Sequence, residues 1–111
     1  MSRTLIAAVA QMGPVARDES RVHVVDRLIA LMREAHGRGA TLVVFPELAL
    51  TTFFPRWLLD TQEEIDSYFE TEVPSNETQP LFEVGKELGV GFHLGYAEKL
   101  TGDDGATHYF N

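Results

Sequence analysis

The feature that most constrains the fold of this chain is an apolar run, an amphipathic helix pattern and a second apolar run, in that order. Residues 4–10 form a nearly continuous apolar run, as in a strand that is covered on both faces. Residues 18–36 carry apolar side chains at every third or fourth position, which predicts a helix, and Gly37 and Gly39 end it. Residues 42–45 predict a second buried strand. Two strands joined through one helix favour a parallel pair with a right-handed crossover.

The second half of the sequence predicts a further helix and a terminal β-hairpin. Residues 56–76 mix short helical turns with loop, whereas residues 79–88 keep their apolar side chains on one helical face. Residues 90–96 alternate apolar side chains with small or polar ones, as a strand with two different faces does. After a turn at TGDDGATH, residues 107–111 look like a strand that pairs back as a hairpin. We therefore predict an α/β fold, and 111 residues allow one domain at most.

Glu47 is the first candidate for a functional residue. It lies just beyond the second predicted strand, and open α/β sheets bind their ligands at the carboxyl ends of their parallel strands. The preceding Phe45–Pro46 restricts the backbone, and the apolar and aromatic residues that follow are expected to surround the carboxylate, which favours a general base over a surface charge. Position alone favours a solvated glutamate or one that caps a nearby helix, and the neighbouring residues shift the balance towards a general base.

The charge balance argues against two classes of partner. Seventeen acidic residues against nine basic ones give a net charge of −8, which disfavours a nucleic-acid backbone or an anionic membrane as the binding partner. Eight of the acidic residues lie between Trp57 and Gly85, a stretch without Lys or Arg: Asp60, Glu63, Glu64, Asp66, Glu70, Glu72, Glu77 and Glu83. Such a run is typical of a solvated face, so we predict that this stretch is exposed.

Several other functions lack the residues that they need. The chain contains no cysteine, which excludes disulfides, Cys-type metal sites and a Cys nucleophile within these 111 residues. A dinucleotide site needs a glycine-rich turn after the first strand, but the turn AQMGPVARD has one glycine followed by proline. The four histidines do not stand at metal-ligand spacing, so no metal is expected: His23, His36, His93 and His108. The apolar start of the chain is too short for a secretory signal or a membrane span, which predicts a cytoplasmic protein.

Four segments together resemble a known enzyme family. The strand VAQMGP, the helix end HGRGA, the strand and acid LVVFPELALT, and the segment LGVGFHLGYAE are similar to the start of the nitrilase superfamily of carbon-nitrogen hydrolases. Within that superfamily, PELALTTFFPRW followed by SYFETEVP resembles the N-carbamoyl-D-amino acid amidohydrolases, or D-carbamoylases. The resemblance covers essentially the whole chain.

The resemblance implies a fold, a reaction and a role for Glu47. The fold is a four-layer α-β-β-α sandwich, and Glu47 matches the glutamate of a Glu-Lys-Cys triad. In this scheme the glutamate accepts the thiol proton, the thiolate attacks the carbonyl carbon, the lysine stabilises the oxyanion and water releases the covalent intermediate. The expected substrate is an N-carbamoyl-D-amino acid, converted to the D-amino acid, ammonia and carbon dioxide without a cofactor.

The aromatic residues after Glu47 are candidates for the substrate pocket. Phe53, Phe54 and Trp57 follow the glutamate closely, although aromatic side chains in such positions often belong to a core instead. Arg56 could bind a substrate carboxylate or form an ion pair with the acidic stretch.

The chain departs from the pattern of the superfamily in one respect. The lysine and cysteine of the triad have no matching motif, and neither Lys86 nor Lys99 stands in one. Residues 1–111 therefore look like the N-terminal part of a carbon-nitrogen hydrolase domain, inactive by itself, with an uncovered sheet that favours homo-oligomers. The alternatives are another nitrilase-superfamily amidase, or a non-catalytic α/β module that binds partners through its exposed half-sheet.

Overall fold

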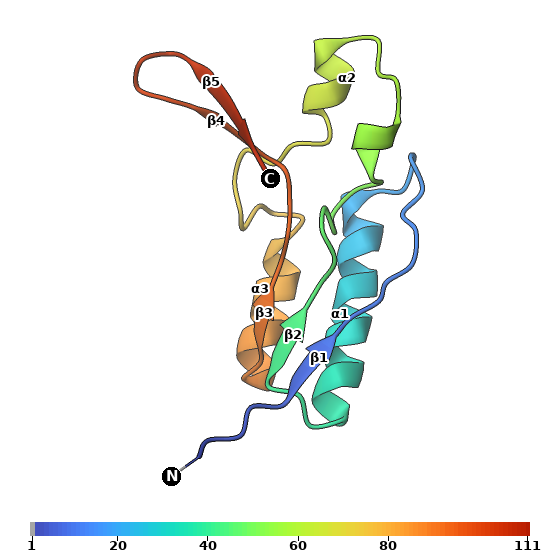
Figure 1. The fold of residues 1–111 in the computed structure, drawn as a ribbon, viewed down its shortest axis with the longest axis vertical. Coiled ribbons are helices and arrows are strands. Elements are labelled where there is room, and N and C mark those ends of the chain that lie inside the picture. The colour runs from blue at the N-terminus through green and yellow to red at the C-terminus, as the bar shows by residue number, and fades with distance from the viewer. Residues whose placement is uncertain (1) are drawn as a thin grey trace.

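A computed structural model describes residues 2–111 and contains a parallel sheet, two helices beside it and a separate hairpin (Figure 1). The sheet has the order β1-β2-β3, with strands β1 (Ala7–Val9), β2 (Leu42–Val44) and β3 (Gly91–His93), and both pairings are parallel. Because β2 is the central strand, the loop that follows its carboxyl end emerges between the chain segments that follow β1 and β3. The predicted parallel pair and its helical connection are confirmed.

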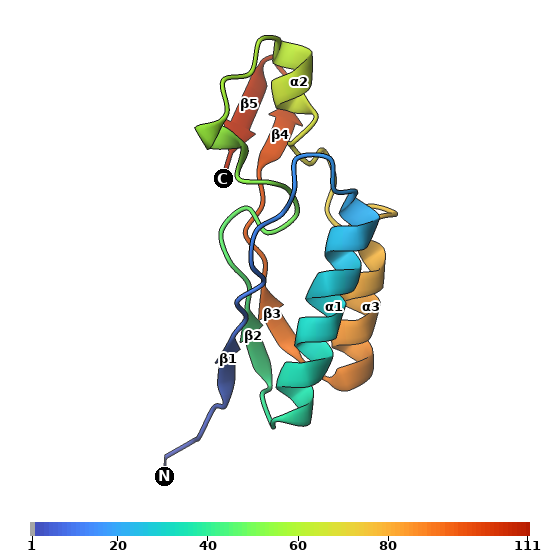
Figure 2. The same cartoon turned by 90° about the vertical axis from the view of Figure 1, so that its right-hand side faces the viewer.

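Helices α1 (Arg21–Gly37) and α3 (Gln79–Leu88) pack against one face of this sheet (Figure 2). The Ser20 hydroxyl caps α1 by accepting a 3.1 Å hydrogen bond from the backbone N–H of His23. Beyond α1, Gly39 adopts a φ of +92°, which side-chain-bearing residues rarely do. The core between helices and sheet is formed mainly by aliphatic side chains, among them Val24, Val25, Leu28, Met32, Val43, Leu50 and Leu81.

The opposite face of the sheet is exposed in the part of the chain that the structure describes. Leu5 is 64% exposed and Val9 is 86% exposed. The expectation that the first strand is covered on both faces is therefore wrong for residues 2–111. The physical reason is that α1 and α3 both lie on the same side, so the outward-facing residues of each strand have no second layer.

Parts of the second half of the chain, on either side of α3 and β3 in sequence, form a smaller unit beyond one end of the parallel sheet (Figure 1). It contains the 3₁₀ turn η1 (Phe54–Arg56), helix α2 (Gln62–Asp66) and an antiparallel hairpin of β4 (Glu98–Thr101) and β5 (Thr107–Phe110). The terminal hairpin is confirmed, but its first strand is not the predicted 90–96 segment. That segment leaves the ladder after His93, and its alternating side chains Leu94 and Tyr96 pack against the main core instead. No helix among residues 2–111 has the length and apolar character needed to cross a membrane.

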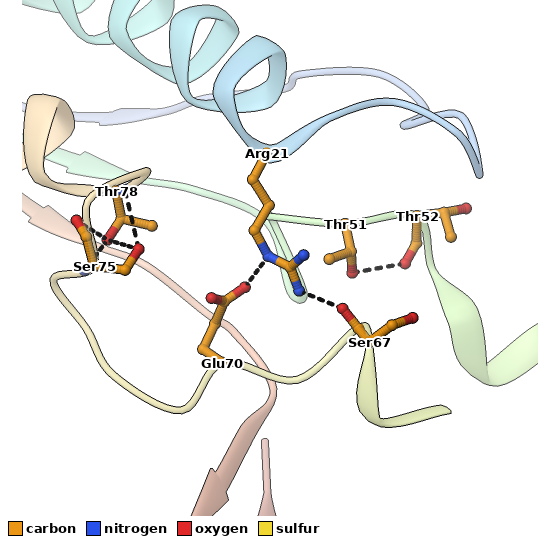
Figure 3. A network of polar contacts seen from close by, with 7 residues as sticks. All are labelled: Arg21, Thr51, Thr52, Ser67, Glu70, Ser75 and Thr78. Atoms are coloured by element: carbon orange, nitrogen blue, oxygen red, sulfur yellow. Dashed lines mark hydrogen bonds and ion pairs between the residues drawn. The ribbon is translucent and has the colours of Figure 1, made fainter. Parts of the chain in front are cut away.

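Ion pairs tie the acidic stretch to the rest of the chain. Glu70, with a side chain 8% exposed, accepts a 2.5 Å hydrogen bond from Nε of Arg21, and Nη2 of the same guanidinium donates to the Ser67 carbonyl (Figure 3). Glu64 pairs with Arg17, and Asp66 pairs with Lys99 at 2.8 Å. The prediction of a uniformly solvated face is therefore wrong at these three carboxylates, because basic residues distant in sequence fold onto them.

Candidate active site

Glu47 lies two residues after the predicted end of the central strand, at the carboxyl edge of the parallel sheet. Strand β2 ends at Val44, the Phe45 N–H still donates to the His93 carbonyl at 3.0 Å, and Pro46 then turns the chain out of the ladder. The N–H of Ala49 donates to the Gly95 carbonyl at 2.9 Å, which fixes the loop to the segment after β3. The backbone that carries the carboxylate is thus held from both sides.

Leu48, directly after Glu47, adopts a left-handed backbone conformation with a φ of +48°. This conformation costs a leucine about 1–2 kcal/mol and persists only where the surroundings enforce it. Here the side chain of Leu48 is buried beside Phe54 and Ala97 in a second, smaller apolar cluster. The burial of Leu48 therefore offsets the strain and sets the direction in which the neighbouring Glu47 leaves the sheet.

Glu47 borders two adjoining hollows. The first has a volume of about 160 Å³ and lies between the β1–α1 loop and the loop after β2; its lining includes Met12, Val15, Glu47, Thr51, Phe53 and Arg56. The second, of about 540 Å³, is lined by Glu47, His93, Leu94, Gly95, Tyr96, Glu98, Phe110 and Asn111. Apolar side chains do surround the loop, but Glu47 itself is exposed. The expected enclosure of the carboxylate is not provided by residues 2–111, because both hollows open outward.

The carboxylate of Glu47 has one side-chain partner in the described part of the chain. Nδ2 of Asn111 donates to Oε1 of Glu47 at 2.7 Å, across 64 positions of sequence. The sequence analysis did not identify Asn111, since no local pattern marks a polar residue at the end of a hairpin strand as a partner of Glu47. The topology could have suggested it only if the hairpin had been placed beside the carboxyl edge of β2.

The three candidate aromatic residues occupy different places. Phe53, which is 47% exposed, borders the first hollow together with Glu47. Phe54 is buried in the second cluster, where its ring stacks on Tyr68 with a centroid distance of 5.2 Å. Trp57 borders a different depression with Leu58 and does not line either hollow at Glu47. Of the three, Phe53 alone is placed to contact a molecule beside Glu47.

Arg56 also lines the first hollow, and it forms no ion pair with any residue between 2 and 111. Its guanidinium lies over the Trp57 ring, 4.9 Å from the centroid, and the guanidinium of Arg17 lies over the same ring at 5.3 Å. The alternative that Arg56 pairs with the acidic stretch is not what the structure shows; Arg17 and Arg21 make those contacts instead. A cation without a carboxylate partner among residues 2–111 therefore lines the same hollow as the candidate base.

Hydrogen bonds around Asp66 shift the pKa values of the groups that hold the hairpin. Lys99, Gln62 and Tyr109 all donate to the Asp66 carboxylate, and the Lys99 bond contributes most to lowering the pKa of Asp66. The same contact raises the pKa of Lys99, whereas burial followed by the contact with Asp66 raises the pKa of Tyr109. These groups support the hairpin and stand apart from Glu47.

No three His, Asp or Glu side chains within residues 2–111 are grouped to bind a metal ion.

A comparison with known protein families identifies the family of this chain. Residues 6–110 match the carbon-nitrogen hydrolase family, so the match covers almost the whole chain. The chain belongs to the carbon-nitrogen hydrolase family. An aliphatic nitrilase from Sinorhizobium fredii (strain HH103) is 31% identical to this carbon-nitrogen hydrolase segment over 115 residues.

The match to the nitrilase is partial on the side of the relative. The alignment covers 93% of this chain but 35% of the nitrilase, so the chain spans about a third of the length of this curated relative. The membership in the nitrilase superfamily that the motifs imply is thus confirmed. The named relative is a nitrilase and not a carbamoylase, so the comparisons support the superfamily and leave the more specific resemblance without support.

Proposed function

We propose that this chain supplies the general base, Glu47, of a cysteine-dependent carbon-nitrogen hydrolase. The observation that carries the proposal is the position of Glu47 beyond the carboxyl end of the central strand, on the shared border of two hollows. Parallel α/β sheets bind ligands at this edge, and the backbone on either side of Glu47 is held by buried or hydrogen-bonded neighbours. A general base must lie within reach of the proton that it accepts, and the held backbone around Glu47 supports this role.

The reaction requires a nucleophile that these 111 residues do not contain. There is no cysteine in the sequence, so the thiol and the lysine of the triad come from other residues of the assembled hydrolase. Glu47 accepts the thiol proton, the thiolate adds to the amide or ureido carbon, and the leaving nitrogen takes up that proton as ammonia or amine. With a nitrile, the thiolate adds to the carbon-nitrogen triple bond, the nitrogen takes up the proton, and ammonia leaves only after water has added. Water then adds to the enzyme-bound carbon and frees the cysteine, with Glu47 again accepting and returning a proton.

For the substrate, the unpaired cation at the first hollow favours a molecule with a carboxylate. An N-carbamoyl-D-amino acid has one, and Arg56 could bind it while Phe53 contacts the amino-acid side chain. The resemblance of PELALTTFFPRW to the carbamoylases supports the same class. The second candidate substrate is an aliphatic nitrile, which the 31% identity to an aliphatic nitrilase supports. A simple aliphatic nitrile carries no carboxylate, so the two candidates differ in their need for Arg56.

The test is a set of single substitutions in the complete hydrolase that carries this chain. Glu47→Gln keeps the size of the side chain but removes its proton acceptor, so kcat should fall by about a hundredfold or more with little change in KM. Glu83→Gln, at an exposed glutamate of α3, is the matched control and should leave both constants unchanged. A near-normal kcat for Glu47→Gln in a folded enzyme would overturn the assignment.

The same enzyme separates the two substrate classes. With N-carbamoyl-D-phenylalanine as substrate, Arg56→Ala should raise KM about tenfold or more, because a charge-assisted hydrogen bond to the carboxylate is lost. With an uncharged aliphatic nitrile, the same substitution should leave KM nearly unchanged. Hydrolysis of the nitrile alone, at a rate independent of Arg56, would support the nitrilase class and overturn the carbamoyl class.

A further inference from the structure

The hydrogen bond between Asn111 and Glu47 has a direction that the chemistry dictates. An amide nitrogen donates and a carboxylate oxygen accepts, so the Asn111 side chain presents its NH₂ group to Oε1 of Glu47, at 2.7 Å. The bond occupies one carboxylate oxygen. The other oxygen, Oε2, has no hydrogen-bond partner within residues 2–111 and stays available as a proton acceptor.

The position of Asn111 depends on contacts well away from Glu47. Asn111 follows β5, whose residue Phe110 stands opposite Glu98 in the hairpin. The strand β4 is joined at its start to Glu70, because the Glu70 N–H donates to the Ala97 carbonyl at 2.7 Å and the Lys99 N–H donates to the Glu70 carbonyl at 2.8 Å. Glu70 is in turn paired with Arg21 of α1 (Figure 3). The amide that meets Glu47 is therefore anchored to the helix layer.

The side of β5 that precedes Asn111 is anchored as well. The Tyr109 ring meets the Phe69 ring edge to face at a centroid distance of 5.0 Å, and the Tyr109 hydroxyl donates to Asp66 at 3.0 Å. An aromatic contact and a hydrogen bond thus restrain β5 at Tyr109, two residues before Asn111. A donor held in this way limits the rotation of the carboxylate that it contacts.

On the basis of the proposed function of Glu47, we propose that Asn111 is a positioning residue that orients the Glu47 carboxylate for proton transfer. An asparagine amide suits this role because it donates a hydrogen bond without titrating and without neutralising the carboxylate, as Lys or Arg would. Loss of the bond frees the side-chain torsions of an exposed glutamate, and a misplacement of about 1 Å can cost a hundredfold in rate. Asn111 acts on the reaction through Glu47 and not through the substrate.

The test compares two variants of Asn111 in the complete hydrolase. Asn111→Ala removes the donor, and Asn111→Asp keeps the shape of the side chain but replaces the donor with a second carboxylate. Both should lower kcat about tenfold or more while KM changes less than about twofold. The matched controls are Asn76→Ala and Asn76→Asp, at an exposed asparagine outside both hollows, and these should keep full kcat.

A double-mutant comparison distinguishes positioning from other roles. In the Glu47→Gln background, Asn111→Ala should cause little further loss, because the base that it orients is already absent. A rise in KM with unchanged kcat would mean that Asn111 contacts the substrate, and an unchanged kcat with a lowered melting temperature would mean a structural role; either result overturns the proposal. Asn111→Asp provides a near-isosteric variant for these measurements if the alanine variant does not fold.

The design also separates this inference from the proposed function. If Glu47→Gln alone lowers kcat but neither Asn111 variant does, the positioning role fails and the general base stands. If Glu47→Gln alone has no effect on kcat, there is no base to orient, and both proposals fail together.

Discussion

The carboxylate of Glu70 and the guanidinium of Arg21, 49 residues apart in sequence, form a largely buried ion pair at 2.5 Å. Arg21 begins the helix that packs on the parallel sheet, and Glu70 is hydrogen-bonded through its backbone to the strand that begins the hairpin. The pair therefore joins the layer beneath Glu47 to the unit that carries Asn111. The sheet and the hairpin contribute one side each to the second hollow.

We predict that Arg21→Ala destabilises the chain by about 2–3 kcal/mol. Removing one partner of a fully buried ion pair lowers the free energy of unfolding by about 3–5 kcal/mol. The Arg21 side chain is 22% exposed, which reduces this penalty. The control is Arg38→Ala, which breaks an exposed pair with Glu34 and should cost less than about 0.5 kcal/mol. Equal urea midpoints for the two variants would show that the stability of the fold does not depend on the ion pair between Arg21 and Glu70.

We also predict that acid weakens the fold through Asp66. Its pKa is lowered in the folded state, chiefly by Lys99, so the contact contributes stability above the ordinary aspartate pKa of about 3.9. This stability is lost as the pH falls through the lower, folded-state pKa. The urea midpoint should therefore fall less between pH 5 and pH 2, roughly, in Asp66→Asn than in the original chain. Asp103→Asn, at an exposed turn residue, should follow the original chain; identical pH profiles for all three proteins would refute the role of Asp66.

The exposed face of the sheet predicts association. Apolar side chains such as Val9 have no covering layer within residues 2–111, and large apolar patches of this kind bind other surfaces. The 111-residue chain should therefore form oligomers or bind a hydrophobic dye, and Val9→Lys should reduce dye fluorescence by roughly half or more. Val22→Lys, at an exposed apolar residue of α1, controls for the added charge. A monodisperse monomer in light scattering with no dye binding would contradict this prediction.

The chain by itself should hydrolyse neither N-carbamoyl amino acids nor nitriles. The proposed mechanism needs a thiolate, and the 111 residues contain no cysteine. Ammonia release from N-carbamoyl-D-phenylalanine by the isolated chain should equal that of its Glu47→Ala variant. Release above that control would require a mechanism without a thiol and would exclude the present one.

Much of the fold could be predicted because the relevant patterns are local. The helix expected over residues 79–88 has those bounds in α3, and the helix expected over 18–36 appears as Arg21–Gly37. Periodicity of apolar side chains and the stop signals at Gly37 and Gly39 act within a few residues, so sequence alone determines them. The placement of Glu47 beyond a parallel strand follows from the same patterns.

The surroundings of Glu47 were decided by tertiary structure. Nothing in the adjacent sequence distinguishes Phe53, which borders the hollow, from Phe54, which is buried against Tyr68. The outcome depends on which face of the loop the small cluster around Leu48 covers. Similarly, the contact between Asn111 and Glu47 joins residues 64 positions apart and exists because the hairpin is held over the edge of the sheet. Such contacts arise from packing between elements, and a local pattern carries no information about which distant side chain will meet a given carboxylate.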